Sequence, residues 1–178
     1  MELSEASSCT RCALSATRTQ VVIGTGSLSA RLIVVGEAPG RHEDEGGQPF
    51  IGRSGQLLFS LIAEELQLSR EECYVTNVVK CRPPDNRTPR APEILACSPW
   101  LDLQKASWHQ SVALALGLTA ARVMVGAKGT MKDLHGVPVR REGLTVVSTY
   151  HPAAALRQGP SVIAVMRSDL AVVRGLLS

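Results

Sequence analysis

The chain has 178 residues, of which 44% are hydrophobic, and a formal net charge of +3 at neutral pH. This length suits one compact domain with its own core, over residues 1–178, and the charge is too small for a polybasic tail protein. No stretch approaches the roughly 20 apolar residues of a membrane span, and the first 19 residues lack the apolar run of a signal peptide, so we expect a cytoplasmic protein that does not enter a membrane.

Strands and helices are predicted to alternate along the chain. The apolar patterns predict a strand at 31–36, a helix at 53–66, a strand at 74–79, a helix at 91–103, a strand at 111–116, a helix at 119–125, a strand at 144–148 and a helix at 161–177. This alternation favours an α/β fold with a parallel sheet covered on both faces. In open sheets of this kind, ligands bind beyond the carboxyl ends of the strands.

The cysteines have the spacing of a metal site. Cys9 and Cys12 form a CxxC pair, Cys81 directly follows the second predicted strand, and Cys97 lies 16 positions further on. Four thiolates from two distant segments suit either a tetrahedral zinc ion or a 4Fe-4S cluster, and composition does not choose between them. The alternative is that they are buried as small hydrophobic residues. Cys73, directly before a strand, is expected to be a packed or partly exposed free thiol and not a ligand.

The loop after the first predicted strand, residues 36–52, has five glycines and two prolines in 17 positions. It is therefore predicted to turn sharply and to bring its backbone close to a ligand. Glu37, directly after the strand, is the best placed residue to supply an acid or to position water. Asp44 and Glu45 are expected to be solvated loop carboxylates. Phe50 either stacks on a flat ligand or anchors the loop to the core.

The segment after the second predicted strand is polar and basic. Asn77 offers one acceptor and two donors, which complement a nucleobase edge, although bonds to neighbouring backbone are an equal alternative. Four basic residues lie among four prolines in the following loop, namely Lys80, Arg82, Arg87 and Arg90. A stiff, basic loop is typical of a surface that contacts phosphates.

The segment after the fourth predicted strand begins with His151, which Pro152 follows directly. A histidine fixed at this edge of the sheet can donate a hydrogen bond to a developing oxyanion or leaving group. A purely structural role is the alternative. Arg157 lies six residues further along.

Taken together, these segments resemble the family-four, iron-sulfur branch of the uracil-DNA glycosylase superfamily. The matching pieces are the Cys9-x2-Cys12 pair, GEAPG at 36–40, Glu43-Asp44, QPFIG at 48–52, TNVVKCRPP at 76–84, NRTPR at 86–90, Cys97, and HPAAALR at 151–157. They extend over nearly the whole chain.

The resemblance implies a three-layer α/β sandwich with a central parallel sheet of about four strands. It implies hydrolysis of the N-glycosidic bond of deoxyuridine in DNA, which releases uracil and leaves an abasic site, by a monofunctional enzyme. It also implies a structural 4Fe-4S cluster on Cys9, Cys12, Cys81 and Cys97, which decides between zinc and iron. The expected partner is uracil-containing DNA, single or double stranded, and the protein is expected to be a monomer associated with the nucleoid.

The resemblance also implies roles for single residues. Phe50 would stack on a flipped uracil, Asn77 would bond its Watson-Crick edge, and His151 would donate to O2 as negative charge develops there. Glu37 would position water or stabilise the cationic sugar. Glu43 matches an active-site position of the family without a defined role.

The expected contacts to the rest of the DNA come from Arg87, Arg90, Leu156 and Arg157. Leu156 is the candidate to enter the duplex, because Ala153, Ala154 and Ala155 stand where the family usually has bulkier side chains. One alternative function is an iron-sulfur module that recognises uracil or abasic DNA without turnover. Another is a zinc-stabilised nucleotide-binding domain.

Overall fold

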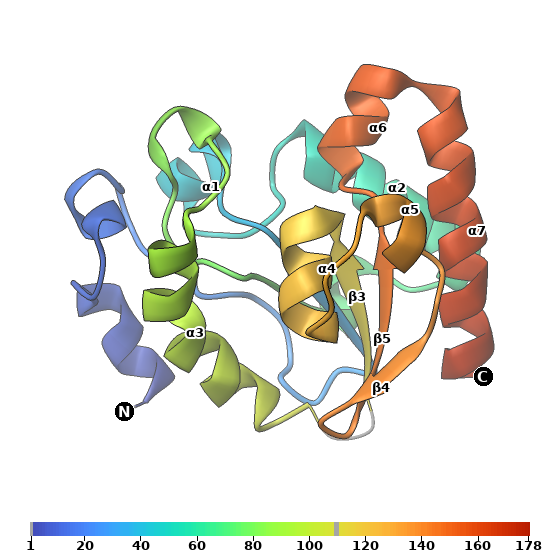
Figure 1. Ribbon diagram of the computed structural model, residues 1–178, viewed down its shortest axis with the longest axis horizontal. Helices are drawn as coiled ribbons and strands as arrows, with labels where there is room; N and C mark the ends of the chain where they lie inside the picture. The colour runs from blue at the N-terminus through green and yellow to red at the C-terminus, as the bar shows by residue number, and fades with distance from the viewer. Residues whose placement is uncertain (1, 109–110) are drawn as a thin grey trace.

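A five-stranded sheet forms the centre of the computed structural model, which describes residues 2–108 and 111–178 (Figure 1). The strands are β1 (Leu32–Gly36), β2 (Cys73–Asn77), β3 (Val112–Leu116), β4 (Val139–Arg141) and β5 (Leu144–Thr149), in the order β2-β1-β3-β5-β4. Strands β2, β1, β3 and β5 are parallel, as predicted. Strand β4 pairs antiparallel with β5 at the edge and was not predicted, because its three residues lack an apolar pattern.

Helices surround the sheet. They are α1 (Arg41–Gly46), α2 (Arg53–Leu66), α3 (Ala91–Lys105), α4 (Gly117–Val125), α5 (Met131–Leu134), α6 (Pro152–Gln158) and α7 (Pro160–Leu177). Short 3-10 helices are η1 (Leu3–Ser8), η2 (Ala13–Ala16), η3 (Arg70–Glu72) and η4 (Pro84–Asn86). None of the helices in the described ranges is both long and apolar enough to cross a membrane.

The two faces of the sheet carry separate halves of the core, because side chains alternate along a strand. From β1, Leu32 and Val34 pack with apolar residues of α2, α6 and α7. Ile33 and Val35 point to the other face, where α3, α4 and the N-terminal segment cover them. The molecule therefore has the three expected layers, and in Figure 1 α7 and α3 lie on opposite sides of the strands.

Three local predictions were wrong. The second strand ends at Asn77, because the Val78 and Val79 amides turn to donate to the Gly36 and Glu37 carbonyls at the end of β1. The glycine-rich loop contains helix α1, whose first turn is stabilised by Glu43. The segment after β5 forms α6, with a proline at its first position. Both helices are too short to show an apolar period in the sequence.

Candidate active site

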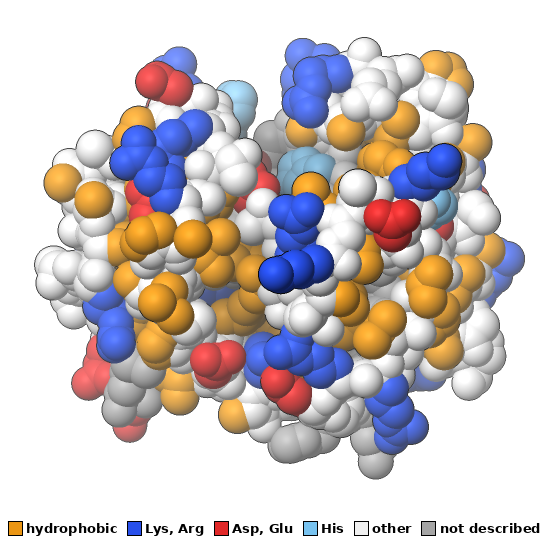
Figure 2. Space-filling model, in the orientation of Figure 1, with side chains coloured by type: hydrophobic (Ala, Val, Ile, Leu, Met, Phe, Trp, Pro, Cys, Tyr) orange, Lys and Arg blue, Asp and Glu red, His pale blue; other side chains and the backbone are white. Residues whose placement is uncertain are grey.

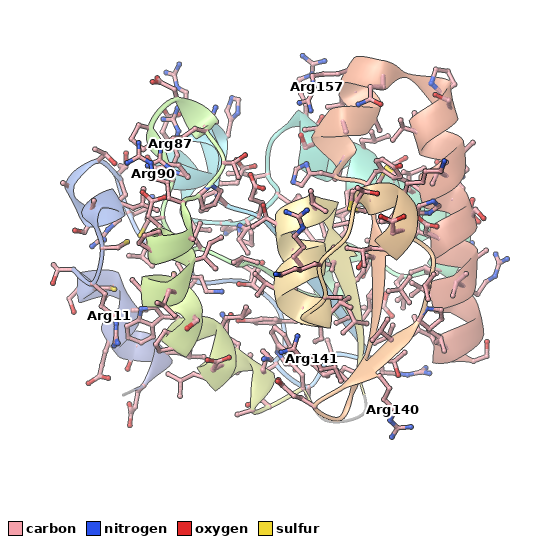
Figure 3. All side chains as sticks on the ribbon, viewed as in Figure 1. Arg11, Arg87, Arg90, Arg140, Arg141 and Arg157 are labelled. Carbon is pink, nitrogen blue, oxygen red and sulfur yellow. The ribbon has the colours of Figure 1, made fainter. Side chains whose placement is uncertain are left out.

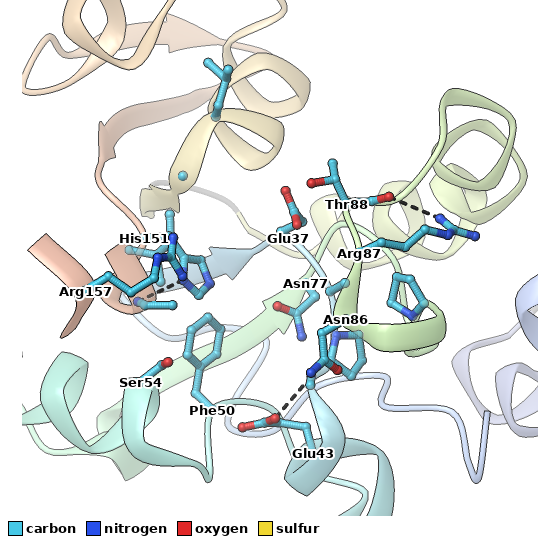
Figure 4. A pocket seen from close by; sticks show the side chains of 18 residues that line it. Glu37, Glu43, Phe50, Ser54, Asn77, Asn86, Arg87, Thr88, His151 and Arg157 are labelled. Carbon is cyan, nitrogen blue, oxygen red and sulfur yellow. Dashed lines mark hydrogen bonds between the residues drawn. The ribbon is translucent and has the colours of Figure 1, made fainter. Parts of the chain in front are cut away.

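A cavity of about 540 Å³ opens at the carboxyl edge of the sheet (Figure 4). Each parallel strand supplies it with a residue at or just beyond its end: Glu37 after β1, Asn77 at the end of β2, Gly117 after β3 and His151 after β5. Seven of the predicted site residues line it together, namely Glu37, Glu43, Phe50, Asn77, Arg87, His151 and Arg157. In the space-filling view the molecule is hollowed at this edge, with one histidine side chain inside the hollow and another at its rim (Figure 2).

Phe50 is fixed against the cavity by unusual backbone geometry. Its φ is 55°, and the Arg70 guanidinium donates to the carbonyls of Pro49 and Phe50, over 3.0 Å to the latter. A Cβ at Gly55 would lie 1.7 Å from the Phe50 carbonyl oxygen, so only glycine fits beneath this turn. The ring is mostly buried and also lines the cavity, with its centroid 5.8 Å from that of His151. Phe50 is therefore positioned both to anchor the loop and to contact a ligand.

Asn77 is buried with an unused acceptor. Its side chain is in the cavity wall and is 1% exposed, and its Oδ1 atom has no hydrogen-bond partner in the described ranges. An unpaired buried polar group costs about 1–3 kcal/mol, so such groups call for an explanation. The backbone bond that the sequence left open as an alternative is not made by this oxygen. Gly36 keeps the space open, because a Cβ there would lie 2.4 Å from Oδ1 and 2.5 Å from the Phe50 ring.

His151 is held as a neutral hydrogen-bond donor. It caps α6, and its Nδ1 atom accepts the backbone N–H of Ala153 over 3.2 Å. The proton of the neutral ring is therefore on Nε2. Burial lowers the pKa of His151 to about 4, with the positive charge of Arg157 acting in the same direction and Glu43 opposing it. Near neutral pH this histidine offers an uncharged N–H.

We expect acid to destabilise the protein through His151. Its folded-state pKa of about 4 lies below the ordinary 6.5, so the unfolded chain binds the proton first as the pH falls. The effect is absent above about pH 6.5 and grows down to about pH 4, where it reaches of order 3 kcal/mol. Urea unfolding from pH 8 to pH 4, on the wild type and on His151→Phe, measures it. An unchanged difference between the two proteins over this range would contradict the assignment.

The two cavity carboxylates are held differently. Glu43 accepts the Gly40 N–H at Oε2 over 3.1 Å and the Gly52 N–H at Oε1 over 2.9 Å, so both of its oxygens stabilise the loop backbone. Glu37 accepts one hydrogen bond, from the Thr119 hydroxyl to Oε2 over 2.5 Å. The described residues provide no donor to its Oε1. Glu37 is therefore the carboxylate that is able to hold a water molecule, and Glu43 shapes the loop.

Asp44 is not the solvated carboxylate that the sequence predicted. It is buried, and its two oxygens accept the Thr19 N–H over 2.9 and 3.1 Å, which ties α1 to the N-terminal segment. A contact between positions 25 residues apart leaves no local signal in the sequence. Glu45 is exposed as expected and pairs with Arg41 over 2.8 Å.

The basic loop is less available than its composition indicates. Arg87 lines the cavity, but its guanidinium is bonded to Glu93 over 2.6 and 2.9 Å, and Glu93 also accepts the Arg90 N–H. The Arg87 hydrogen bonds lower the pKa of Glu93 to about 2 although burial opposes this. Glu93 was missed in the sequence, where its only signal was its place three residues after the helix cap.

Lys80 does not belong to the surface at all. It is 1% exposed, and its ammonium donates to the Thr76 hydroxyl, the Asn77 carbonyl and the Gln104 side chain over 2.6 to 2.8 Å. Burial lowers its pKa to about 7. Gln104, whose amide also donates to Tyr74, was not noticed in the sequence because it lies in a helix without a marked polar face.

Three arginines flank the opening, of which Arg87 is half-buried and Arg90 and Arg157 are exposed. Arg87 and Arg90 lie on one side of it, and Arg157 lies on the other, at α6 (Figure 3). Leu156, also on α6, is 43% exposed. Neither Leu156 nor Arg90 lines the cavity. An elongated polyanion lying across the opening would meet positive charge on both sides.

The four predicted ligand cysteines meet around a second, small cavity, Cys9 and Cys12 from the N-terminal segment, Cys81 after β2 and Cys97 on α3. No group of three metal-binding side chains that could hold a single ion is present among the described residues. Cys73 is outside this group, as expected, with its thiol donating to the Ser69 carbonyl, and burial raises its pKa to about 12.

Within the described part of the chain, N–H groups donate to the sulfurs of Cys9, Cys81 and Cys97. The Trp100 indole donates to Cys9 over 3.2 Å, the Lys80 backbone N–H donates to Cys97 over 3.3 Å, and Arg18 donates to Cys81 over 3.6 Å. Sulfur is a weak acceptor as a thiol and a better one as a thiolate. The donors therefore suit a group of metal-bound thiolates.

Comparison with known proteins agrees with this geometry. Residues 23–171 match the model of the uracil DNA glycosylase superfamily. The chain is 44% identical to a type-4 uracil-DNA glycosylase of Thermotoga maritima over 151 residues, which are 84% of this chain and 78% of the relative. It is 41% identical to the type-4 enzyme of Saccharolobus solfataricus, over 98% of this chain and 84% of the relative. A type-5 uracil-DNA glycosylase of Pyrobaculum aerophilum is 35% identical over 72% of this chain and 63% of the relative.

Proposed function

The chain belongs to the uracil-DNA glycosylase superfamily, in its type-4 branch, and we propose that the cavity at the sheet edge is where it removes uracil from DNA. The activity is that of a DNA-repair hydrolase, which cleaves the N-glycosidic bond of deoxyuridine and leaves an abasic site. The observation that supports this cavity most directly is the buried Oδ1 atom of Asn77, which no described residue pairs and which shares one space with Phe50 and His151.

The base is read once it has left the duplex, at a cost of a few kcal/mol. Its flat face stacks against the Phe50 ring. Asn77 accepts the N3–H of uracil at Oδ1 and donates its amide N–H to O4. Cytosine has no hydrogen at N3, so it would place an acceptor against the Asn77 oxygen.

Bond cleavage moves charge in two directions. The C1′–N1 bond breaks with its electron pair remaining on the uracil ring, and the His151 Nε2–H donates to O2, where negative charge builds up. The deoxyribose becomes oxocarbenium-like, and the negative charge of the Glu37 carboxylate stabilises the positive charge on the sugar. Glu37 also orients a water molecule, whose oxygen bonds to C1′ and whose proton the carboxylate accepts.

The test of this function is release of free uracil from an oligonucleotide that contains one deoxyuridine. We expect the purified protein to release uracil, and alkali then to break the strand at the abasic site. Oligonucleotides with thymine or cytosine at the same position serve as controls. A protein that binds the uracil strand tightly and releases no base would favour the non-catalytic recognition module.

The enzyme is proposed to leave the DNA strand intact. Strand cleavage through a Schiff base needs a free amine at C1′. Among the described residues no lysine lines the cavity, and Lys80, the lysine of the matching segments, is buried and donates to three oxygens. No covalent complex is therefore expected when borohydride is added during turnover.

We also propose a 4Fe-4S cluster on Cys9, Cys12, Cys81 and Cys97. The support is the shared cavity of the four sulfurs and the three N–H donors directed at them. When bound, the cluster supplies a covalent link between the N-terminal segment and the β2–α3 connection. Protein purified without oxygen should contain about four irons per chain and absorb at about 400 nm. A colourless protein with one zinc would support the zinc alternative.

Arg157 and Arg87 should respond differently to substitution. In the described ranges Arg157 has no acidic partner, so Arg157→Ala should weaken DNA binding and lower the slope of log affinity against log salt by about 1, with little change in stability. Arg87→Met removes the guanidinium partner of the buried Glu93 and should lower the free energy of unfolding, which Arg157→Ala should not. Salt titrations and urea unfolding measure both. Equal salt slopes for the two variants, with equal stability, would contradict this division.

We further propose that Leu156 enters the space left by the flipped base. It is exposed on α6, beside the cavity residue Arg157. Because the substrate is DNA, we place the protein in the cell with the nucleoid.

A further inference from the structure

The Glu37 carboxylate is held by one side chain from a distant part of the chain. Thr119, 82 residues away, donates its hydroxyl to Oε2 over 2.5 Å. The other oxygen, Oε1, has no donor within the described ranges, and Glu37 lines the cavity. The bond therefore makes the two oxygens of the carboxylate unequal.

A turn at the end of β3 places Thr119 behind Glu37. Gly117 has a φ of 81°, so α4 begins immediately at the edge of the sheet. A Cβ at Gly117 would lie 3.1 Å from the His151 Cβ, which shows how closely this turn approaches the donor histidine. Gly117 and Leu118 line the cavity, whereas Thr119 does not. Thr119 thus contacts Glu37 without being placed to contact a ligand.

A glutamate needs such a support to orient water. Its side chain has three rotatable bonds, and attack at C1′ requires an aligned nucleophile, since misplacement by about 1 Å can cost 100-fold in rate. A hydroxyl cannot donate to a carboxylate and leave that carboxylate free to rotate. The bond to Oε2 also removes one of two competing positions for the water.

We propose that Thr119 is a positioning residue for uracil release, which fixes the rotamer of Glu37 so that Oε1 alone holds the attacking water. The inference rests on the proposed function. A second threonine offers a contrast: Thr130 donates to Asp133 over 2.7 Å in the exposed first turn of α5, where the bond only caps that helix.

The test compares Thr119→Val, which keeps the shape and loses the hydroxyl, with Thr119→Ser, which keeps the hydroxyl. With a deoxyuridine oligonucleotide, we expect Thr119→Val to lower kcat about tenfold and to change KM less than about twofold, since DNA binding is untouched. Thr119→Ser should restore most of the rate. Thr130→Val is the matched control and should leave kcat unchanged. Thermal melting checks the fold, and Thr119→Ala replaces the valine variant if that variant does not fold.

A double-mutant cycle separates positioning from a general loss of structure. If Thr119 acts through Glu37, the double variant Glu37→Gln/Thr119→Val should be no slower than Glu37→Gln alone. Equal losses in both backgrounds, a rise in KM alone, or a serine variant as slow as valine would each overturn the inference. A wild-type protein that releases no uracil would overturn the proposed function, and this inference with it. A fully active Thr119→Val would overturn only the inference.

Discussion

Replacing His151 with asparagine should lower kcat for uracil release by about 100- to 1,000-fold, which is the loss typical of removing one donor to a developing oxyanion. Asparagine is a good helix cap, so it can still accept the Ala153 N–H at the start of α6. Its side chain is too short to bring a donor to the position of the histidine Nε2. KM for the uracil oligonucleotide should change little, because the donor matters most when the bond breaks. Steady-state kinetics give both quantities.

His151→Ala serves as the companion variant. It loses the donor and the cap together, so its kcat should match that of the asparagine variant while its free energy of unfolding falls by about 1 kcal/mol. The absorption expected from the proposed 4Fe-4S cluster should be the same in both variants as in the wild type, since His151 does not contact the cysteine site. A colourless or aggregated asparagine variant, or one with wild-type kcat, would show that the histidine has a structural role.

Replacing Asn77 with leucine should lower kcat/KM for uracil by about 100-fold, which is the expected loss of two base-edge hydrogen bonds. The same change should leave the protein as stable as before, or more stable by about 1 kcal/mol. The reason is that Oδ1 is buried and no described residue donates to it, and an apolar side chain of similar volume removes that cost. Uracil-release kinetics and urea unfolding measure the two effects.

The opposite signs make the Asn77 test specific. A structural asparagine would lose activity only in proportion to lost stability, so a parallel fall in both quantities would count against base recognition. Val79→Ala, a truncation in the adjacent buried core, is a suitable control that should lower stability with a smaller effect on kcat/KM.

The parts of the fold with regular patterns were predictable from the sequence. Four short apolar runs predicted the four parallel strands, and the rule that ligands lie beyond their carboxyl ends located Glu37, Asn77 and His151 in one cavity. Helices α1 and α6 were not predicted because they are only six and seven residues long. Their ends are stabilised by caps and, in α6, by a proline at the first position, so they have no apolar stripe that the sequence could show.

The charged residues were harder to predict, because charge alone says little about which partners the folded chain brings to a residue. Lys80 reads as a basic surface residue, yet the fold surrounds it with three oxygen acceptors. Asp44 reads as solvated, yet it holds the N-terminal segment. Arg87 reads as a phosphate ligand, yet Glu93 already occupies its guanidinium. In each case the partner is chosen by tertiary packing.

Gly36 has a consequence for inheritance. Every missense change of a glycine codon adds at least a Cβ, and at this position a Cβ would collide with both Asn77 and Phe50. Every other side chain would displace Asn77 or Phe50 from the cavity wall, so we expect no missense change of this codon to be neutral. Cytosine deaminates spontaneously to uracil, which pairs with adenine at replication. A lineage that lost this glycine, without another enzyme to compensate, would therefore accumulate C-to-T transitions throughout its genome.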